Sequence, residues 1–332
     1  MKLYLFCFKI LSHFCIHIRS LMSATAKAYL ALIFICIVWG TTYMAIRVGV
    51  EYYPAFLFAG TRQLISGLIL LLVAYVTNKK FDLSAANILR QLVIGFLMLT
   101  LGNGLVTWGE RTVPSGAAAL ICSAMPIFAV LFGLLQSNTH KINATIGGGM
   151  LLGTLGVALI FRQDVAALTN GKYILGILAI VMATASWAGG SVYNRKNINP
   201  VNPLFNAALQ LSFGGIVMLV ISAATENYEN LTLMHSKGLL SLVYLIVFGS
   251  VLAYSAYMYA LQHLPVGIAT IYAYINPLVA VLMGVFILHE QANIYTALSF
   301  CAIMCSVFLV KKGYQQQQNK HAALAAQASE AK

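Results

Sequence analysis

The chain alternates long apolar stretches with short polar connections over most of its length. Ten apolar stretches of 18 to 24 residues occur, and a transmembrane helix needs about 20 such residues. They cover residues 28–46, 55–77, 88–108, 115–135, 144–161, 172–193, 204–224, 238–261, 266–288 and 293–310. The longest connection, residues 225–237, is too short to form a domain. The pattern predicts an all-α membrane protein with ten transmembrane helices.

Two of these stretches resemble each other closely. Residues 113–133 align with residues 264–284 without a gap, and eight of the 21 positions are identical. The identical pairs are Pro114 and Pro265, Gly116 and Gly267, Ala118 and Ala269, Pro126 and Pro277, residues 129–131 and 280–282, and Gly133 and Gly284. Chance matches between apolar helices are scattered Leu and Ala, and they rarely place two prolines and two glycines in register. The match indicates an internal duplication.

The duplication divides the ten stretches into two sets of five, at residues 28–161 and 172–310. Because five is odd, the second set enters the membrane from the opposite side. Inverted repeats of this kind are typical of secondary transporters, whose substrate site lies near the bilayer midplane between the repeats. We therefore expect two inverted five-helix repeats around a central cavity.

Composition supports a membrane location. The 332 residues are 60% hydrophobic and 8% charged, whereas soluble domains are about 25% charged. The net charge of +12 lies in connections and tails, so it reflects membrane topology and predicts no nucleic-acid partner. With the amino terminus inside, 14 Lys and Arg residues fall on the cytoplasmic side and five on the outer side. The positive-inside rule then places both termini in the cytoplasm.

The two ends of the chain differ in character. Residues 1–27 form an extension that is apolar and basic, and an alternative reading is that synthesis starts at Met22. Residues 311–332 are polar and low in complexity, and we expect a disordered cytoplasmic tail. The six cysteines form no CxxC pair, so neither a disulfide framework nor a metal site is expected.

Arg62 is the charged residue that lies furthest inside an apolar stretch. A charge in a transmembrane helix is costly and usually faces the bundle interior. Arg62 is therefore a candidate contact for an anionic solute group. The alternative is a structural role, in which Arg62 reaches the outer interface or pairs with Glu51 or Glu110.

Amides and prolines inside the apolar stretches form a second group of candidates. Asn276 directly precedes Pro277, and Asn103 lies in the third stretch. Both are candidate solute contacts, although buried amides often only link neighbouring helices. Pro126 and Pro277 remove a backbone donor in mid-helix, so they are candidate kinks or hinges. Their alternative role is to shape helix packing.

Aromatic residues form the third group. Candidates for a cavity wall that stacks on an amphipathic solute are Trp39, Tyr43, Tyr254, Tyr257, Tyr272 and Tyr274. Belts of Trp and Tyr at the membrane interface are the alternative. Gly149 and Gly153 form a GxxxG pair, which predicts close helix packing.

No catalytic set is visible in the sequence. His residues lie only in connections and tails, and HExxH, GxSxG and Walker patterns are absent. We therefore expect neither an enzyme nor a cofactor. Proton coupling needs a titratable group on the path. The acidic candidates, Glu51, Glu110 and Glu290, all lie at the ends of apolar stretches, so the coupling ion stays open.

The same residues resemble those of the EamA-type drug/metabolite transporter superfamily. The resemblance covers residues 28–310 and rests on the run Trp39 to Tyr43, on Arg62, on the paired Pro and Gly helices, and on Gly284 with Glu290. One departure is Thr139, which stands where Glu290 has its counterpart. The resemblance implies ten helices as two repeats in a bacterial inner membrane. It also implies export of amino acids, metabolites or drug-like compounds.

The sequence thus predicts a secondary transporter for small organic solutes that works by alternating access. Two alternatives remain: a solute importer of the same fold, and a membrane scaffold that transports nothing. The expected partners are the solute and the lipid bilayer. Two five-helix repeats suffice to enclose a path in a monomer, and a homodimer is compatible with the sequence.

Overall fold

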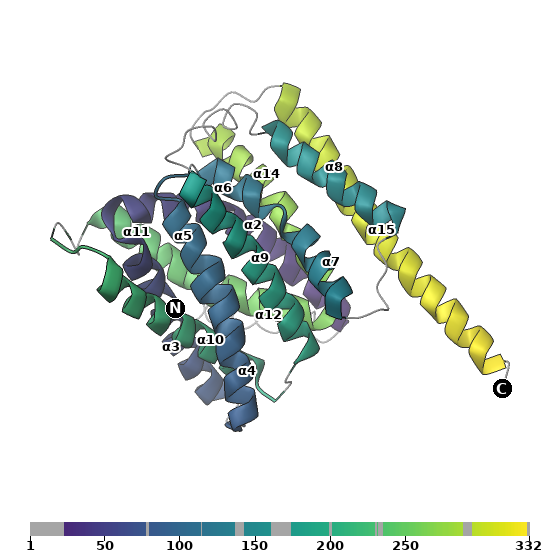
Figure 1. The fold of residues 1–332 in the computed structure, drawn as a ribbon, viewed down its shortest axis with the longest axis horizontal. Coiled ribbons are helices and arrows are strands. Elements are labelled where there is room, and N and C mark those ends of the chain that lie inside the picture. The colour runs from purple at the N-terminus through teal and green to yellow at the C-terminus, as the bar shows by residue number, and fades with distance from the viewer. Residues whose placement is uncertain are drawn as a thin grey trace, which may run out of the picture.

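A computed structural model describes residues 23–77, 80–113, 115–136, 143–160, 174–198, 201–229, 231, 235–287 and 294–330. Within these ranges every regular element is helical, and no strand occurs (Figure 1). The N-terminal extension up to Met22, the segment that contains Thr139, and the segment that contains Glu290 lie outside the described residues. The observed fold class is all-α, as the sequence predicts.

The first half of the chain begins with two long helices, α2 (Ala24–Tyr52) and α3 (Ala55–Thr77). The third apolar stretch forms one continuous rod, in which α4 (Ala85–Gly95) passes into the π-helix η1 (Phe96–Gly104) and then into α5 (Leu105–Gly109). Three further helices follow: α6 (Ser115–Cys122), α7 (Met125–Gln136) and α8 (Ala144–Ile160).

The second half repeats this order. Two long helices, α9 (Ile174–Lys196) and α10 (Pro203–Thr225), come first. The next rod consists of α11 (Ser236–Tyr244), the π-helix η4 (Leu245–Leu252) and α12 (Ala253–His263). The last helices are α13 (Val266–Ala269), α14 (Tyr272–Ile287) and α15 (Ile294–Glu330). The two π-helices start 149 residues apart (245 minus 96), close to the 151-residue offset of the sequence duplication.

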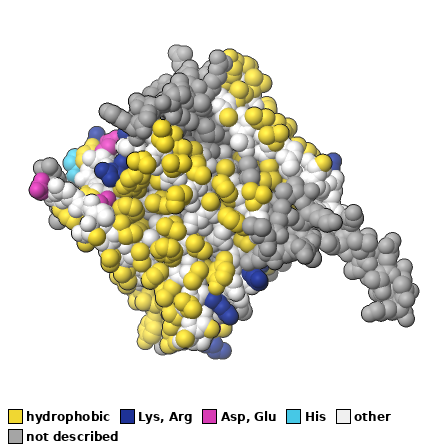
Figure 2. Space-filling view, viewed as in Figure 1, with side chains coloured by type: hydrophobic (Ala, Val, Ile, Leu, Met, Phe, Trp, Pro, Cys, Tyr) yellow, Lys and Arg dark blue, Asp and Glu magenta, His cyan; other side chains and the backbone are white. Residues whose placement is uncertain are grey.

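Six helical segments of the described chain are long and apolar enough to cross a membrane. They are Ala24–Tyr52, Ala55–Thr77, Ala85–Gly109, Ile174–Lys196, Pro203–Thr225 and Ser236–His263. Two further apolar helices, Ala144–Gly156 and Val266–Val279, are shorter. Side chains such as Val76 and Leu240 expose 71% of their surface. Figure 2 shows hydrophobic side chains spread over the central face, with Lys and Arg near its edges. Such a surface suits lipid.

Polar groups from the connections complete several helix ends. The Asn202 side chain accepts a hydrogen bond from the Phe205 N–H at the start of α10. The two carboxylate oxygens of Glu226, which follows α10, accept the N–H groups of Phe56 and Leu57, each at 2.9 Å. The first N–H groups of a helix have no partner within it, so this distant carboxylate caps α3 and ties it to the end of α10.

The two proline-containing stretches are both interrupted. The first breaks at Ser123 and Ala124, directly before α7, so that Pro126 lies in the first turn of that helix. The second breaks at Thr270 and Ile271, and Pro277 lies inside α14. The prolines are in register in the sequence, but the interruptions are not. A hinge role for either proline stays a prediction.

The helices α8 and α15 pack side by side at the edge of the molecule (Figure 1). A Cβ atom built on Gly153 would lie 2.4 Å from the Ser306 Oγ, and one built on Gly149 would lie 3.0 Å from two side chains of α15. The glycines therefore let the two backbones approach, as the GxxxG pair predicts. Where composition predicts a disordered tail, α15 continues as a helix to Glu330, in keeping with the Ala-rich sequence of this end.

Small residues also bring α3 and α10 together. A Cβ atom built on Gly215 of α10 would lie 2.5 Å from the backbone nitrogen of Leu64 and 2.9 Å from the Gly60 carbonyl oxygen. We expect Gly215→Val to lower the stability of the detergent-solubilised protein by at least about 1–3 kcal/mol, because backbone atoms cannot move aside as a flexible side chain can. Thermal unfolding measures this.

The matched control is Gly148→Val on α8, where nothing lies within 4 Å of a Cβ atom built on the glycine. The same substitution there tests helix propensity without the clash. Equal losses of stability in the two variants would mean that the close approach of α3 and α10 is not what makes Gly215 necessary.

Candidate functional site

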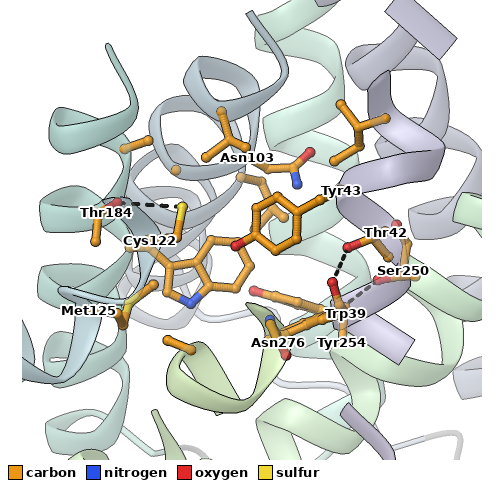
Figure 3. A pocket seen from close by; sticks show the side chains of 18 of the residues that line it. Trp39, Thr42, Tyr43, Asn103, Cys122, Met125, Thr184, Ser250, Tyr254 and Asn276 are labelled. Atoms are coloured by element: carbon orange, nitrogen blue, oxygen red, sulfur yellow. Dashed lines mark hydrogen bonds between the residues drawn. The ribbon is translucent and has the colours of Figure 1, made fainter. Parts of the chain in front are cut away.

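A cavity lies at the centre of the helix bundle, with about 680 Å³ of space not filled by protein atoms, part of it open to the outside. Its walls come from both halves of the chain (Figure 3). The first half contributes Trp39, Thr42, Tyr43, Ile46, Arg62, Gln63, Leu99, Gly102, Asn103, Val106, Cys122 and Met125. The second half contributes Ala183, Thr184, Trp187, Gly249, Ser250, Tyr254, Tyr272, Ala273 and Asn276.

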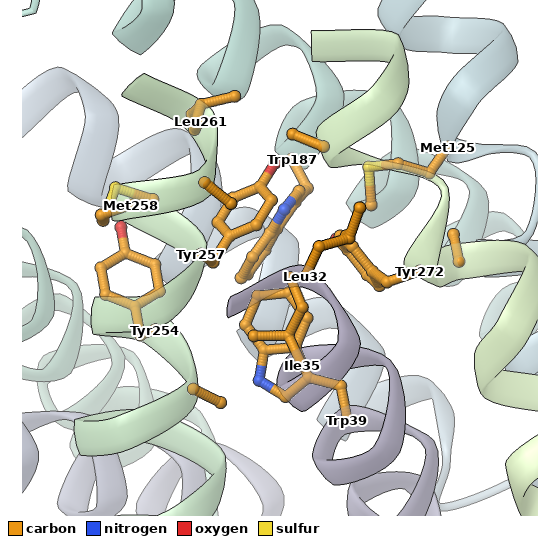
Figure 4. Packing of buried hydrophobic residues seen from close by; sticks show 14 of the residues in the cluster. Leu32, Ile35, Trp39, Met125, Trp187, Tyr254, Tyr257, Met258, Leu261 and Tyr272 are labelled. Carbon is orange, nitrogen blue, oxygen red and sulfur yellow. The ribbon is translucent and has the colours of Figure 1, made fainter. Parts of the chain in front are cut away.

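An aromatic cluster that consists of Trp39, Trp187, Tyr254, Tyr257 and Tyr272 packs beside the cavity, and all of these rings except that of Tyr257 line it (Figure 4). The Trp39 ring lies 5.6 Å from the Trp187 ring and 4.7 Å from the Tyr272 ring, both edge-on. Edge-to-face contacts at these distances are the favoured geometry of aromatic pairs. The cluster joins helices α2, α9, α12 and α14. Its ring contacts therefore depend on the position of the first half of the chain relative to the second.

Trp39 is held in place from two sides. Its indole N–H donates to the Gly249 carbonyl oxygen in η4 at 2.9 Å. Next to it, Gly40 has no side chain, and a Cβ atom there would lie 2.6 Å from Val279 of α14. The Trp-Gly pair thus lets α2 approach α14 while the indole faces the cavity.

A chain of four polar side chains also lines the cavity. The Arg62 Nε donates to the Ser250 Oγ at 2.8 Å, and this hydroxyl donates to the Gln63 Oε1 at 3.3 Å. The Gln63 amide donates in turn to the Asn103 Oδ1 at 2.9 Å. Asn103 and Ser250 belong to the two π-helices η1 and η4, and π-segments inside α-helices often occur at functional sites.

Arg62 is 4% exposed, and its Nη1 has no hydrogen-bond partner. Both carboxylate oxygens of Glu110 are also without a hydrogen-bond partner, and Glu51 is exposed. Arg62 therefore does not reach the outer surface and does not form a hydrogen-bonded pair with Glu110. The two charges still act on each other over a longer distance, so a structural pairing with Glu110 stays the alternative to a solute contact at Arg62.

A third corner of the cavity contains a thiol and two hydroxyls. The Thr184 hydroxyl lies 3.7 Å from the Cys122 sulfur, and the Tyr43 hydroxyl interacts with the same sulfur (Figure 3). These groups come from α9, α6 and α2. They give the cavity weak donors and acceptors beside its aromatic wall.

A ladder of buried amides leads from the cavity toward the start of α4. The Tyr254 hydroxyl donates to the Gln210 Oε1, and the Gln210 amide donates to the Gln91 Oε1 at 2.6 Å. Gln91 donates to Asn87 at 3.0 Å, and Asn87 donates to the Asp82 carbonyl oxygen at 2.9 Å. Four amide and phenol side chains are thus linked between the cavity and one end of the bundle.

Seven of the nine predicted solute contacts line the cavity: Asn276, Asn103, Tyr272, Tyr254, Trp39, Tyr43 and Arg62. Tyr257 lies behind the wall and shares a 2.8 Å hydrogen bond with Ser191. Tyr274 points elsewhere, toward α8, where its hydroxyl donates to the Met150 carbonyl oxygen at 3.3 Å. Asn276 links helices when its amide nitrogen faces the carbonyl oxygens of Tyr272 and Cys36, at 2.9 and 3.1 Å.

Several lining residues are not identified from the sequence. Gln63 follows Arg62 directly, and Thr42, Ser250 and Thr184 look like ordinary small helix residues. The one feature of the sequence that could have identified Gln63 as a lining residue is its position next to a charge inside an apolar stretch. Across the described part of the chain, no group of three or more His, Cys, Asp or Glu residues is placed to hold a metal ion.

Comparison with known proteins agrees with this arrangement. The model of the EamA-like transporter family matches the chain twice, at residues 26–162 and 174–311. An uncharacterized inner membrane transporter of Escherichia coli K12, YedA, is 34% identical over 286 residues, which cover 85% of this chain and 90% of that protein. An uncharacterized transporter of Bacillus subtilis, YoaV, is 25% identical over 290 residues, with 85% and 96% covered.

The fold also has a solved counterpart. A crystal structure with 17% sequence identity superimposes with a TM-score of 0.69 and covers 87% of this chain and 97% of that one. At this identity the likeness concerns the fold alone. The family model covers most of this chain, and the match to the E. coli relative covers 85% of this chain and 90% of that protein. The chain belongs to the EamA-like transporter family, and it is a multi-pass membrane transporter rather than an enzyme.

Proposed function

We propose that the protein is a secondary exporter of small organic solutes, and that the central cavity is its solute site. The observation that carries this proposal is the composition of the cavity wall. Helices of both halves contribute an aromatic cluster and the hydrogen-bonded chain of Arg62, Ser250, Gln63 and Asn103. A mainly apolar pocket with a few convergent polar groups is the usual form of a small-molecule site.

The proposed mechanism is alternating access by two inverted five-helix repeats in a ten-helix protein. The two family matches, the 151-residue offset of the prolines and the two corresponding π-helices support the duplication. Rocking of one repeat against the other changes the contacts at their interface. The aromatic cluster spans that interface, because Trp39 belongs to the first repeat and the other four rings to the second.

The proposed location is a bacterial inner membrane with both termini in the cytoplasm. The excess of Lys and Arg in the connections assigned to the inner side supports this orientation. The amide ladder then leads from the cavity to the cytoplasmic face, and Glu110 lies at the outer end of its helix. Amino acids, metabolites or drug-like compounds are the solute classes that the family resemblance implies.

Reconstituted vesicles test this function. Vesicles are loaded with a mixture of amino acids, organic acids, sugars, nucleosides and cationic dyes, and the loss of each solute is followed by mass spectrometry. We expect one class to leave vesicles that contain the protein at least tenfold faster than vesicles with the Asn103→Ala variant. In vesicles that contain the protein in one defined orientation, a solute that accumulates against its gradient only on the side that corresponds to the cytoplasm would identify an importer. Vesicles that release nothing faster than protein-free ones would favour the scaffold.

A further inference from the structure

Two charged side chains are buried inside the described part of the bundle, and they carry opposite charges. Arg62 on α3 is 4% exposed, and Glu110 at the end of α5 is 0% exposed. Every other buried polar side chain among the described residues is an amide, a hydroxyl or a thiol. Charges are retained in such places when a function needs them, because taking them out of water is costly.

Neither buried charge is neutralised by direct contact. The Arg62 Nη1 and both Glu110 carboxylate oxygens have no hydrogen-bond partner. Arg47 of α2 approaches Glu110 but donates to its backbone carbonyl oxygen instead of its carboxylate. The arrangement leaves one donor and two acceptors inside the protein without partners, which native interiors normally avoid.

The groups around Glu110 limit how its charge can be balanced. The charges that act on the carboxyl are Arg47 of α2, which is half-buried, and Arg62 of α3. Tyr43 of α2 and Cys122 of α6 also interact electrostatically with Glu110. Ordinary phenols and thiols are mostly uncharged near neutral pH, so these two groups do not balance its charge. Arg111, the next residue, is exposed and screened by solvent. Arg62 is therefore the one fully buried charge among these groups.

Arg62 lines the cavity, and its Nη1 has no hydrogen-bond partner. The ligand that suits this cationic side chain has an anionic group. The guanidinium group suits oxyanions such as carboxylate and phosphate. The aromatic cluster that lines the same cavity suits an apolar body. An anion at Arg62 removes the compensation that Arg62 gives to an ionised Glu110 and adds a second negative charge. Two anions and one buried cation are unfavourable, and one proton on Glu110 restores the balance.

We propose that the cavity binds a monovalent organic anion with an apolar body together with one proton, with the anion at Arg62 and the proton on Glu110. One negative charge and one proton enter together, so each binding event is electrically neutral, and the carboxylate of Glu110 becomes a carboxylic acid. This rests on the proposed function and names its solute class and its coupled ion.

Thermodynamic linkage gives the proposal a quantitative form. Where Glu110 is already protonated in the empty protein, the dissociation constant of the anion does not depend on pH. Above that range the anion must recruit a proton. Its dissociation constant then rises toward tenfold per pH unit. A neutral ligand of the same shape shows no such slope.

Calorimetric titration of the detergent-purified protein between about pH 6 and 9 tests this. The probes are 3-phenylpropionate, the permanently ionised 2-phenylethanesulfonate and the neutral 3-phenylpropanamide, and further aryl and alkyl carboxylates extend the anion set. We expect both anion types to bind with the tenfold slope. In Glu110→Gln they bind at least as tightly, without the slope. Arg62→Gln loses at least a hundredfold in anion affinity and keeps its affinity for the amide. Glu51→Gln, which changes an exposed carboxylate, keeps the slope.

The outcomes separate the parts of the proposal. A slope that persists in Glu110→Gln, or is absent from the wild type throughout this range, overturns Glu110 as the proton site. Amide or amine ligands that bind tighter than every anion overturn the solute class, while transport itself stands. If no anion of the set binds, the anion proposal is wrong. If the vesicle assay also moves no solute, the proposed function falls with it.

Discussion

Replacement of Trp39 by alanine is expected to lower the stability of the protein by about 3–5 kcal/mol and to abolish solute binding. The indole packs edge-on against Trp187 and Tyr272 and donates to the Gly249 carbonyl oxygen, so its removal opens the aromatic cluster and leaves a buried acceptor in η4 without its partner. Thermal unfolding and ligand titration in detergent measure the two effects.

The variants around Trp39 separate packing from hydrogen bonding. Trp39→Phe keeps a ring in the cluster and loses the N–H, so we expect a smaller loss than for alanine. Trp108→Ala is the matched control, because Trp108 is half-buried on α5 and does not line the cavity. If Trp108→Ala costs as much stability and binding as Trp39→Ala, the aromatic cluster has no special role.

Replacement of Gln210 by leucine is expected to cost about 2–6 kcal/mol. This side chain is 1% exposed, accepts from the Tyr254 hydroxyl and donates to Gln91. Leucine leaves a buried hydroxyl and a buried amide oxygen unpaired, at about 1–3 kcal/mol each. Because Tyr254 also lines the cavity, solute affinity is expected to fall as well.

A double-mutant cycle tests whether the ladder is the cause. In a Tyr254→Phe background the hydroxyl is already gone, so Gln210→Leu is expected to cost at least about 1 kcal/mol less than in the wild type. Gln262→Leu, a half-buried amide on α12, serves as the control and is expected to change little. Additive losses would show that Tyr254 and Gln210 do not act together.

The sequence predicts the class of fold because lipid demands it. Long apolar stretches with few charges have few soluble alternatives. Over the described residues the structure confirms an all-α fold, and its long helices suit a membrane. The Gly149–Gly153 pair predicts a close helix contact because only a missing side chain permits one, and the contact with α15 is there. The ten-helix count and the inversion remain proposals.

The cavity is predicted less completely, for physical reasons. Trp39, Asn103 and Arg62 stand out because aromatic, amide and charged groups are unusual in apolar helices. Tyr274 has the same chemistry as Tyr272, but two residues along a helix turn a side chain toward another neighbour, α8. The π-helices are invisible to hydropathy, although they bring Asn103 and Ser250 to the cavity. Glu110 lies at the end of an apolar stretch, and its burial depends on packing by other helices.

The measurement that tests the central cavity most directly is ligand-dependent thermal stability. Detergent-purified wild type, Asn103→Ala and Tyr274→Phe are heated with members of each solute class. A ligand at a hundredfold excess over its dissociation constant stabilises the folded state by about 2.7 kcal/mol. We predict that one class raises the melting temperature of the wild type and of Tyr274→Phe, and that Asn103→Ala loses the shift. A shift that survives Asn103→Ala but disappears in Tyr274→Phe would place the solute outside this cavity and contradict the account.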